Sequence, residues 1–183
     1  MSLSTRNKGL SIREMAIFSM LGAIMFLSKI LMEAIPNIHL LGTLTMTYTL
    51  AYRKKALIPL YIYVFLNGIY AGFALWWIPY LYIWTVLWAI TMLLPKNMKR
   101  STACIVYAIV CGIYGVFFGV LYAPAQALLF GLDFEGMIAW IIAGSVFDVL
   151  SAVGNFVTGF LIVPLLETIR KIDKSAVRVN RVG

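Results

Sequence analysis

The chain has 183 residues, of which 62% are hydrophobic and 12% are charged. A soluble domain is about half apolar and about a quarter charged, so this composition excludes an ordinary soluble enzyme and a disordered chain. It predicts an all-α integral membrane protein, with room for about six spans of ~20 residues. No separate ATP-hydrolysing domain fits in the remaining length, so such an activity is expected on other chains.

The apolar runs, taken in chain order, predict six transmembrane helices in a single membrane domain of residues 12–170. The polar segment 1–11 has no small-residue cleavage site, so the first run is expected to be retained. A loop with Pro124, Gly131, Asp133 and Glu135 precedes the last span, which is longer than one crossing requires. A basic tail of residues 171–183 follows, expected to be loosely ordered after Asp173. The predicted spans are residues 12–35, 38–52, 56–71, 79–94, 102–122 and 136–169.

Positive charges alternate between the connections. Every Lys and Arg except Lys29 lies before or at the very start of span one, or after spans two, four and six. The other connections contain Glu33, Asp133 and Glu135 and no basic residue. Because Lys and Arg favour the cytoplasmic side of a membrane, both termini are expected in the cytoplasm. The net charge of +8 is therefore interpreted as a topology signal and not as a nucleic-acid surface.

Aromatic residues are dense around the predicted outer ends of spans three and four. Tyr80, Trp84 and Trp88 follow at intervals of four residues, which places them in one stripe down span four. One interpretation is packing or contact with lipid at an aromatic belt. The other is a slot, with Trp77 at its mouth, in which a flat and partly polar ligand stacks.

Two charged residues, Lys29 and Asp148, lie clearly within the predicted spans, away from their ends. A charge in hydrocarbon costs at least about 2.5–3.5 kcal/mol, so an ion pair between them is predicted. The pair is either structural or part of a ligand pocket, and Lys29 has the alternative of extending its long stem to the interface. Further polar candidates are Asn67 in span three and Ser151 and Asn155 on the Asp148 face of span six. His39, near the outer start of span two, is interpreted either as a hydrogen bonder at the end of a loop or as a ligand contact.

The residues needed for common catalytic centres are missing from the sequence. There is one histidine, and the two cysteines, Cys104 and Cys111, are too far apart on one helix to bridge. No Ser-His-Asp set, Gly-rich phosphate loop or His-Glu-x-x-His motif is present. We therefore expect no catalytic residues, no metal and no cofactor, and a chain that is not an enzyme.

Three features of the sequence form a familiar combination. They are six spans in so short a chain, the small-residue segment Ala16-Ile17-Phe18-Ser19-Met20-Leu21-Gly22-Ala23, and the last-span sequence Phe147-Asp148-Val149-Leu150-Ser151-Ala152-Val153-Gly154-Asn155-Phe156. With these features the chain resembles the S component of an energy-coupling factor (ECF) transporter. The resemblance covers about residues 10–172. It implies a subunit in the plasma membrane of a prokaryotic-type cell that captures a water-soluble vitamin from outside. Its implied partners are a transmembrane coupling subunit and two ATPase subunits, which together form an ABC-type importer.

The resemblance also implies roles for particular residues. Span one of the family docks on the coupling subunit through an Ala-x-x-x-Ala motif, and the matching residues here are Ala16, Ser19, Gly22 and Ala23, although Met20 interrupts the motif. Packing within the chain is the alternative for these small residues. The implied substrate-binding residues are Lys29, His39, Asn67, Trp77, Tyr80, Trp84, Trp88, Asp148, Ser151 and Asn155.

Flat heteroaromatic vitamins fit such a slot. An aminopyrimidine edge donates and accepts hydrogen bonds, which favours hydroxymethylpyrimidine, with pyridoxine-like vitamers next. The alternatives to a vitamin-binding subunit are a self-sufficient small secondary carrier or channel, and a structural or assembly membrane protein.

Overall fold

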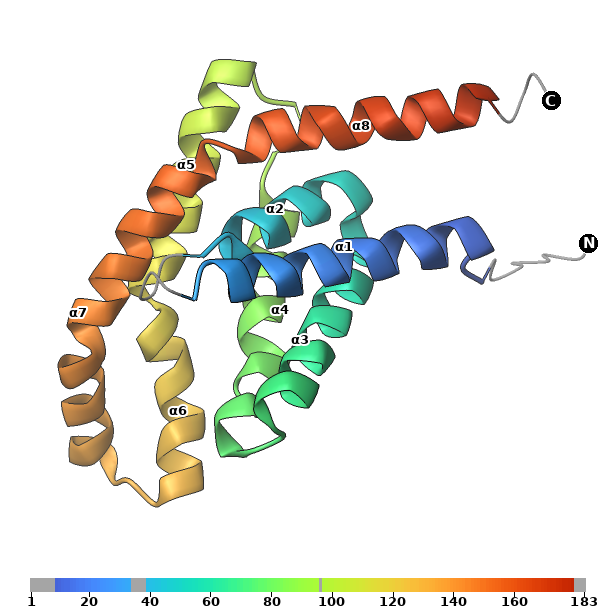
Figure 1. The fold of residues 1–183 in the computed structure, drawn as a ribbon. Coiled ribbons are helices and arrows are strands. Elements are labelled where there is room, and N and C mark those ends of the chain that lie inside the picture. The colour runs from blue at the N-terminus through green and yellow to red at the C-terminus, as the bar shows by residue number, and fades with distance from the viewer. Residues whose placement is uncertain (1–8, 34–38, 96, 180–183) are drawn as a thin grey trace, which may run out of the picture.

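The computed structural model describes residues 9–33, 39–95 and 97–179, and every regular element in these residues is a helix (Figure 1). The prediction of an all-α protein is therefore confirmed. The α-helices are α1 (Ile12–Leu31), α2 (Leu41–Tyr52), α3 (Leu57–Ala71), α4 (Tyr80–Leu93), α5 (Arg100–Val116), α6 (Phe118–Phe130), α7 (Phe134–Gly159) and α8 (Ile162–Val179). Two short 3-10 helices, η1 (Arg53–Ala56) and η2 (Leu75–Trp77), precede α3 and α4.

Four stretches of the described chain are long and apolar enough to cross a membrane. They are Ile12–Leu31, Leu75–Leu93, Arg100–Phe130 and Phe134–Gly159. The two other predicted spans are helical, as α2 and α3, but contain only 12 and 15 residues. Both are shorter than the ~20 residues that usually cross the hydrocarbon core. The chain is compatible with a membrane protein, with four helices of spanning length where six spans were predicted.

The predicted span 136–169 is divided into two helices. α7 ends at Gly159, and α8 begins at Ile162 and turns sharply away from the line of α7 (Figure 1). Pro164 accounts for the division, because it has no N–H to bond the Phe160 carbonyl and its ring would clash there in a continuous helix. In the first turn of a new helix the same residue is tolerated. α8 then continues to Val179, where a loosely ordered tail was predicted.

The predicted span 102–122 also differs from the structure. α5 and α6 follow one another with an interruption at Phe117, and α6 continues to Phe130. Pro124 was expected in a loop and lies inside α6. The turn into α7 uses Gly131 in the left-handed region, at φ 67°, and Asp133, whose carboxylate accepts a hydrogen bond from the Gly136 N–H. These two residues end one helix and cap the next.

α2 is the central helix of the structure. All of its residues from Leu41 to Leu50 are buried, and it contacts α1, α4, α5, α7 and α8. A helix that is buried all round needs its polar groups satisfied internally. Thr47 and Thr49 achieve this by donating to the carbonyls of Thr43 and Thr45, each at 2.7 Å, whereas the buried hydroxyl of Thr45 has no partner among the described residues. The short, threonine-rich run predicted as span two therefore forms the core around which the longer helices pack.

The four basic clusters predicted from the sequence lie close to one another in space. Contacts between them are the ion pairs Lys55–Glu14, Arg13–Asp173 (3.9 Å) and Arg100–Glu167 (3.3 Å), and the hydrogen bond from Arg53 to the Met92 carbonyl (2.9 Å). Arg6, Lys8, Lys96 and Arg181 lie outside the described residues. Exposed pairs of this kind add little stability. These contacts instead show that α1, α8, η1 and the start of α5 meet at one end of the molecule.

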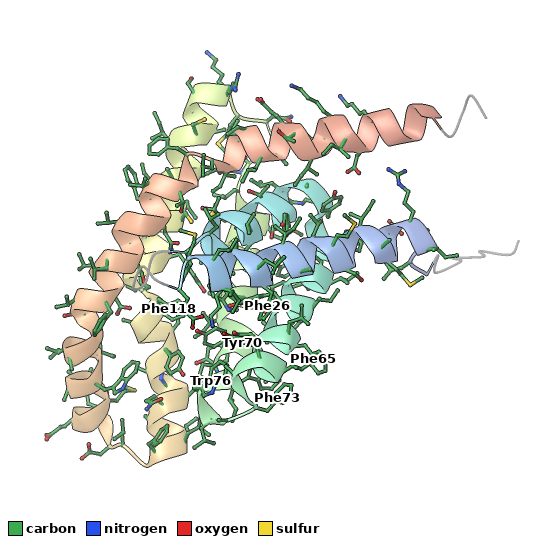
Figure 2. The ribbon with its side chains drawn as sticks, viewed as in Figure 1. Phe26, Phe65, Tyr70, Phe73, Trp76 and Phe118 are labelled. Carbon is green, nitrogen blue, oxygen red and sulfur yellow. The ribbon has the colours of Figure 1, made fainter. Side chains whose placement is uncertain are left out.

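Aromatic side chains gather away from this basic end. Figure 2 shows Phe65, Tyr70, Phe73 and Trp76 around the ends of α3 and α4 that are farthest from α8. Phe65, Tyr70 and Phe73 are more than half exposed, as are apolar residues along α7 such as Val146. So much exposed apolar surface is unusual for a soluble monomer and is compatible with contact with lipid.

Candidate functional site

Trp84 on α4 lies at the centre of a cluster of rings and is only 1% exposed. The neighbouring rings have centroids within 6.2 Å of the Trp84 ring centroid. They belong to His39 before α2, Tyr63 on α3, Tyr80 on α4, Tyr114 on α5 and Phe118 on α6. Segments that are distant in sequence therefore enclose one tryptophan.

Four residues at this place carry buried polar atoms that have no hydrogen-bond partner in the described part of the chain. The atoms are His39 Nδ1, Tyr63 Oη, Asn67 Oδ1 and Trp84 Nε1. Asn67 is four residues after Tyr63 on α3, so the two share a helix face. We call His39, Tyr63, Asn67 and Trp84 the polar cluster. Leaving one such atom unpaired costs about 1–3 kcal/mol, and therefore a group of four requires a physical explanation.

Other polar aromatic groups nearby do have partners. The Tyr114 hydroxyl donates to the Ile83 carbonyl at 2.9 Å. The indole N–H of Trp77 donates to the Val64 carbonyl at 2.8 Å, and that of Trp88 to the Arg53 carbonyl at 3.1 Å. These groups hold helices together. Of the predicted stripe, Tyr80 and Trp84 meet in the ring cluster, whereas the polar ends of Trp77 and Trp88 are engaged in packing.

The predicted ion pair between Lys29 and Asp148 is wrong. The Lys29 ammonium lies 3.7 Å from the carboxylate of Glu33, just after the end of α1, and 5.6 Å from the centre of the Tyr70 ring. Asp148 Oδ1 instead accepts a hydrogen bond from the backbone N–H of Gly119 at 3.0 Å. Gly119 is in the first turn of α6, where backbone N–H groups lack helical partners. Asp148 therefore caps α6 at its interruption with α5.

Ser151 and Asn155 lie where α7 packs against other helices. Both are buried. A Cβ built on Gly42 of α2 would be 3.1 Å from Asn155 Oδ1, and one built on Gly115 of α5 would be 2.9 Å from the backbone carbonyl carbon of Ser151. The structure thus places these two predicted residues at the contacts of α7 with α2 and α5.

The small residues of α1 fall on different faces. Gly22 is buried, and a Cβ added there would be 2.6 Å from Ile62 of α3, so Gly22 serves packing within the chain. Ala16 and Ser19 are exposed and Ala23 is half-buried. The outward face of α1 therefore retains three of the four predicted docking residues.

Sequence reasoning found His39, Asn67, Tyr80 and Trp84 but missed Tyr63, Tyr114 and Phe118. The spacing of Tyr63 and Asn67 was a usable signal, because it marks a polar face within an apolar run. Nothing in the sequence indicated that α5 and α6 would contribute rings to the same place.

The arrangement offers hydrogen bonds and flat apolar walls. The described residues contain no group of three His, Cys, Asp or Glu side chains that could hold a metal ion. Hydrogen-bonding atoms beside flat ring faces are the groups from which small-molecule sites are usually built.

Comparison with known proteins finds no match to this chain among family models, curated proteins or solved structures. The functional argument therefore depends on the side chains themselves.

Proposed function

We propose that this chain is the substrate-binding S component of an ECF-type importer, which captures a small water-soluble vitamin or precursor for ATP-driven uptake by partner subunits. The observation that carries the proposal is the polar cluster. Its four buried polar atoms have no hydrogen-bond partner among the described residues, and aromatic rings from several helices surround Trp84. A ligand that bonds these atoms removes the cost of leaving them unpaired, and the rings provide surfaces for stacking.

The types of polar atom in the cluster favour a particular ligand edge. Trp84 Nε1 is only a donor and needs an acceptor on the ligand, whereas Asn67 Oδ1 is an acceptor and needs a donor. The Tyr63 hydroxyl serves as either. A flat ring with an acceptor nitrogen beside an amino or hydroxyl group meets these requirements. Hydroxymethylpyrimidine is therefore the favoured substrate, and pyridoxine is the next.

Two features support a subunit that works with membrane partners. The described stretches of spanning length and the exposed apolar surface favour a location in the membrane. The outward face of α1 combines the small residues Ala16 and Ser19 with Met20, which is 65% exposed. Small residues allow two membrane helices to approach closely, as docking on a coupling subunit requires. ATP hydrolysis is assigned to two further partner chains.

Thermal unfolding of the purified chain in detergent tests the proposal. The unfolding midpoint is measured with hydroxymethylpyrimidine, thiamine, pyridoxine, pantothenate, riboflavin, biotin and folate, each against buffer. A ligand that binds only the folded state, at 100 times its Kd, stabilises it by about 2.7 kcal/mol. Hydroxymethylpyrimidine is expected to raise the midpoint most, without ATP.

Two outcomes would contradict the proposal. The first is that no vitamin raises the unfolding midpoint and no ATPase module co-purifies, because the chain would then have neither the proposed ligand nor the proposed partners. Transport of a vitamin into liposomes by the chain alone identifies a self-sufficient carrier instead.

A further inference from the structure

A hollow of about 430 Å³ lies between α6 and α7, apart from the polar cluster. Its volume is within the range of small-molecule pockets, about 300–1,000 Å³. Phe118, whose ring centroid is 5.9 Å from that of Trp84, stands between the two places. The lining residues are Phe118, Gly119, Tyr122 and Gln126 of α6 and Trp140, Gly144, Phe147 and Asp148 of α7.

One wall of the hollow is a pair of stacked rings. Tyr122 and Trp140 are nearly parallel, with an angle of 15° between their planes and 5.6 Å between their centroids. The Tyr122 hydroxyl donates to the Trp76 carbonyl at 2.9 Å, which fixes the ring in place. Flat ring faces of this kind attract both aromatic ligands and cations.

The hollow also contains a carboxylate without a cation. Asp148 is half-buried and accepts one hydrogen bond, from the Gly119 N–H to Oδ1. None of the four ion pairs among the described residues involves Asp148, and Lys29 is paired with Glu33. An acidic group at this depth in a membrane helix usually faces a partner charge or a wet cavity.

We propose that the hollow between α6 and α7 is a binding site for a flat organic cation, such as an amidinium or a protonated amino-heterocycle. The ligand's ring stacks beside Tyr122 and Trp140, and its N–H groups donate to Asp148. The Gln126 amide lies on the lining for a further polar contact. The hydrogen bond from the Gly119 N–H fixes the Asp148 carboxylate, and the bond from the Tyr122 hydroxyl to the Trp76 carbonyl fixes the Tyr122 ring. Because both binding groups are already ordered, the entropic cost of binding is lower. This site does not depend on the proposed function of the polar cluster.

Benzamidine and its uncharged analogue benzamide are the probes that test the site. Each is titrated by calorimetry into the full chain in lipid nanodiscs. Benzamidine is expected to bind at least tenfold more tightly than benzamide, because only the cation is attracted by Asp148. Asp148→Asn should remove this preference.

A second variant is needed because Asp148 also caps α6, so that Asp148→Asn could weaken binding by disturbing the fold. A Cβ at Gly144 would meet no atom within 4 Å, so Gly144→Phe is expected to fill the hollow without a clash at its Cβ. Benzamidine affinity should fall at least tenfold in this variant. The control is Ala143→Phe, which adds the same ring at an exposed neighbouring position outside the lining and should retain affinity within twofold.

Three results would overturn the proposal. They are the absence of benzamidine binding to the wild-type chain, equal affinity for benzamide and benzamidine, and undiminished binding to Gly144→Phe. Equal affinity would identify an apolar hollow that accepts lipid or detergent.

Discussion

Trp84 and Trp88 lie one turn apart on α4, yet their indole N–H groups have different surroundings. Trp88 Nε1 donates to the Arg53 carbonyl at the end of α2, whereas Trp84 Nε1 is buried and has no partner in the described ranges. A satisfied N–H stabilises the folded chain, and an unsatisfied one destabilises it. Trp88 therefore serves packing, whereas the proposed function assigns Trp84 to ligand binding.

Replacing each tryptophan with phenylalanine tests this difference. Trp84→Phe removes the unpaired donor, so the unfolding midpoint of the ligand-free chain should not fall. Affinity for the stabilising vitamin should weaken roughly 5- to 150-fold, which corresponds to about 1–3 kcal/mol for the lost hydrogen bond. Trp88→Phe, the matched control, should lower the midpoint and leave affinity unchanged. Equal affinities of Trp84→Phe and wild type in a titration would contradict the assignment.

Lys29 and Asp148 have separate partners, and this predicts independent energetics. In a double-mutant cycle of Lys29→Met and Asp148→Asn, the coupling in the free energy of unfolding should stay below about 0.5 kcal/mol. Breaking a buried ion pair would instead cost about 3–5 kcal/mol and couple the two sites strongly. The free energy of unfolding is measured for the wild type, the two single variants and the double variant by equilibrium unfolding in mixed detergent micelles. A coupling of several kcal/mol would restore the ion pair that the sequence predicted.

Individual site residues were predictable to the extent that they were unusual in their surroundings. His39, Asn67 and Trp84 could be named because polar or bulky groups within apolar runs need partners. The partner of Asp148 could not be named, because it is the backbone N–H of Gly119. Such a group is available only where a helix is interrupted, and no side-chain pattern marks the interruption at Phe117.

At the scale of helices, α5 and α7 approach closely through glycines. A Cβ on Gly115 would be 2.6 Å from the Ala152 Cα, and one on Gly159 would be 2.6 Å from the Ala108 Cα. Backbone atoms cannot move aside as the end of a side chain can. Close approach through small residues is a typical way for membrane helices to associate, since the hydrophobic effect does not drive them together in lipid.

Gly115→Ala and Gly144→Ala form a matched pair of tests for this contact. Both changes favour the helix by about 1 kcal/mol through propensity. Overpacking at Gly115 should nevertheless give a net loss of roughly 1–3 kcal/mol. Gly144→Ala should be neutral or slightly stabilising, because its added Cβ meets nothing within 4 Å. Thermal unfolding in one detergent compares them, and equal midpoints would refute the close contact.

Helix positions were more predictable than helix ends. The apolar runs located α1, α3 and α4 to within a few residues, because hydropathy follows what lipid or a core requires. Apolar runs do not show where a helix bends, so the divisions at Phe117 and at Phe160–Leu161 were missed. Pro164 was the available signal for the second division, since proline favours the first turn of a helix over its interior.

At the scale of the whole molecule, the segments that contain the alternating basic clusters are joined by ion pairs. Glu14 contacts Lys55, Asp173 contacts Arg13 and Glu167 contacts Arg100, so the three pairs join α1 to η1, α1 to α8 and α5 to α8. Hydropathy and charge alone predicted that these segments share one side of a membrane. In the folded chain these segments are joined by ion pairs, and the side of a membrane on which they lie stays a prediction.

Single-cysteine labelling in intact cells tests on which side of the membrane these segments lie. In a chain with Cys104 and Cys111 replaced by alanine, cysteine is introduced at the exposed positions Lys54, Glu135 or Lys174. Because Lys and Arg are retained in the cytoplasm, a membrane-impermeant maleimide should label Glu135→Cys in intact cells. Lys54→Cys and Lys174→Cys should react only after permeabilisation.

The Cys-free chain controls for reaction with other groups, and full reaction of all three variants in detergent shows that each thiol is accessible. Labelling of Lys54→Cys and Lys174→Cys in intact cells, with Glu135→Cys protected, would invert the proposed orientation. Labelling of Lys54→Cys alone would separate two clusters that the Glu14–Lys55 and Arg13–Asp173 pairs hold together. That result would contradict the packing of α1 between them, because a membrane cannot pass between groups in direct contact.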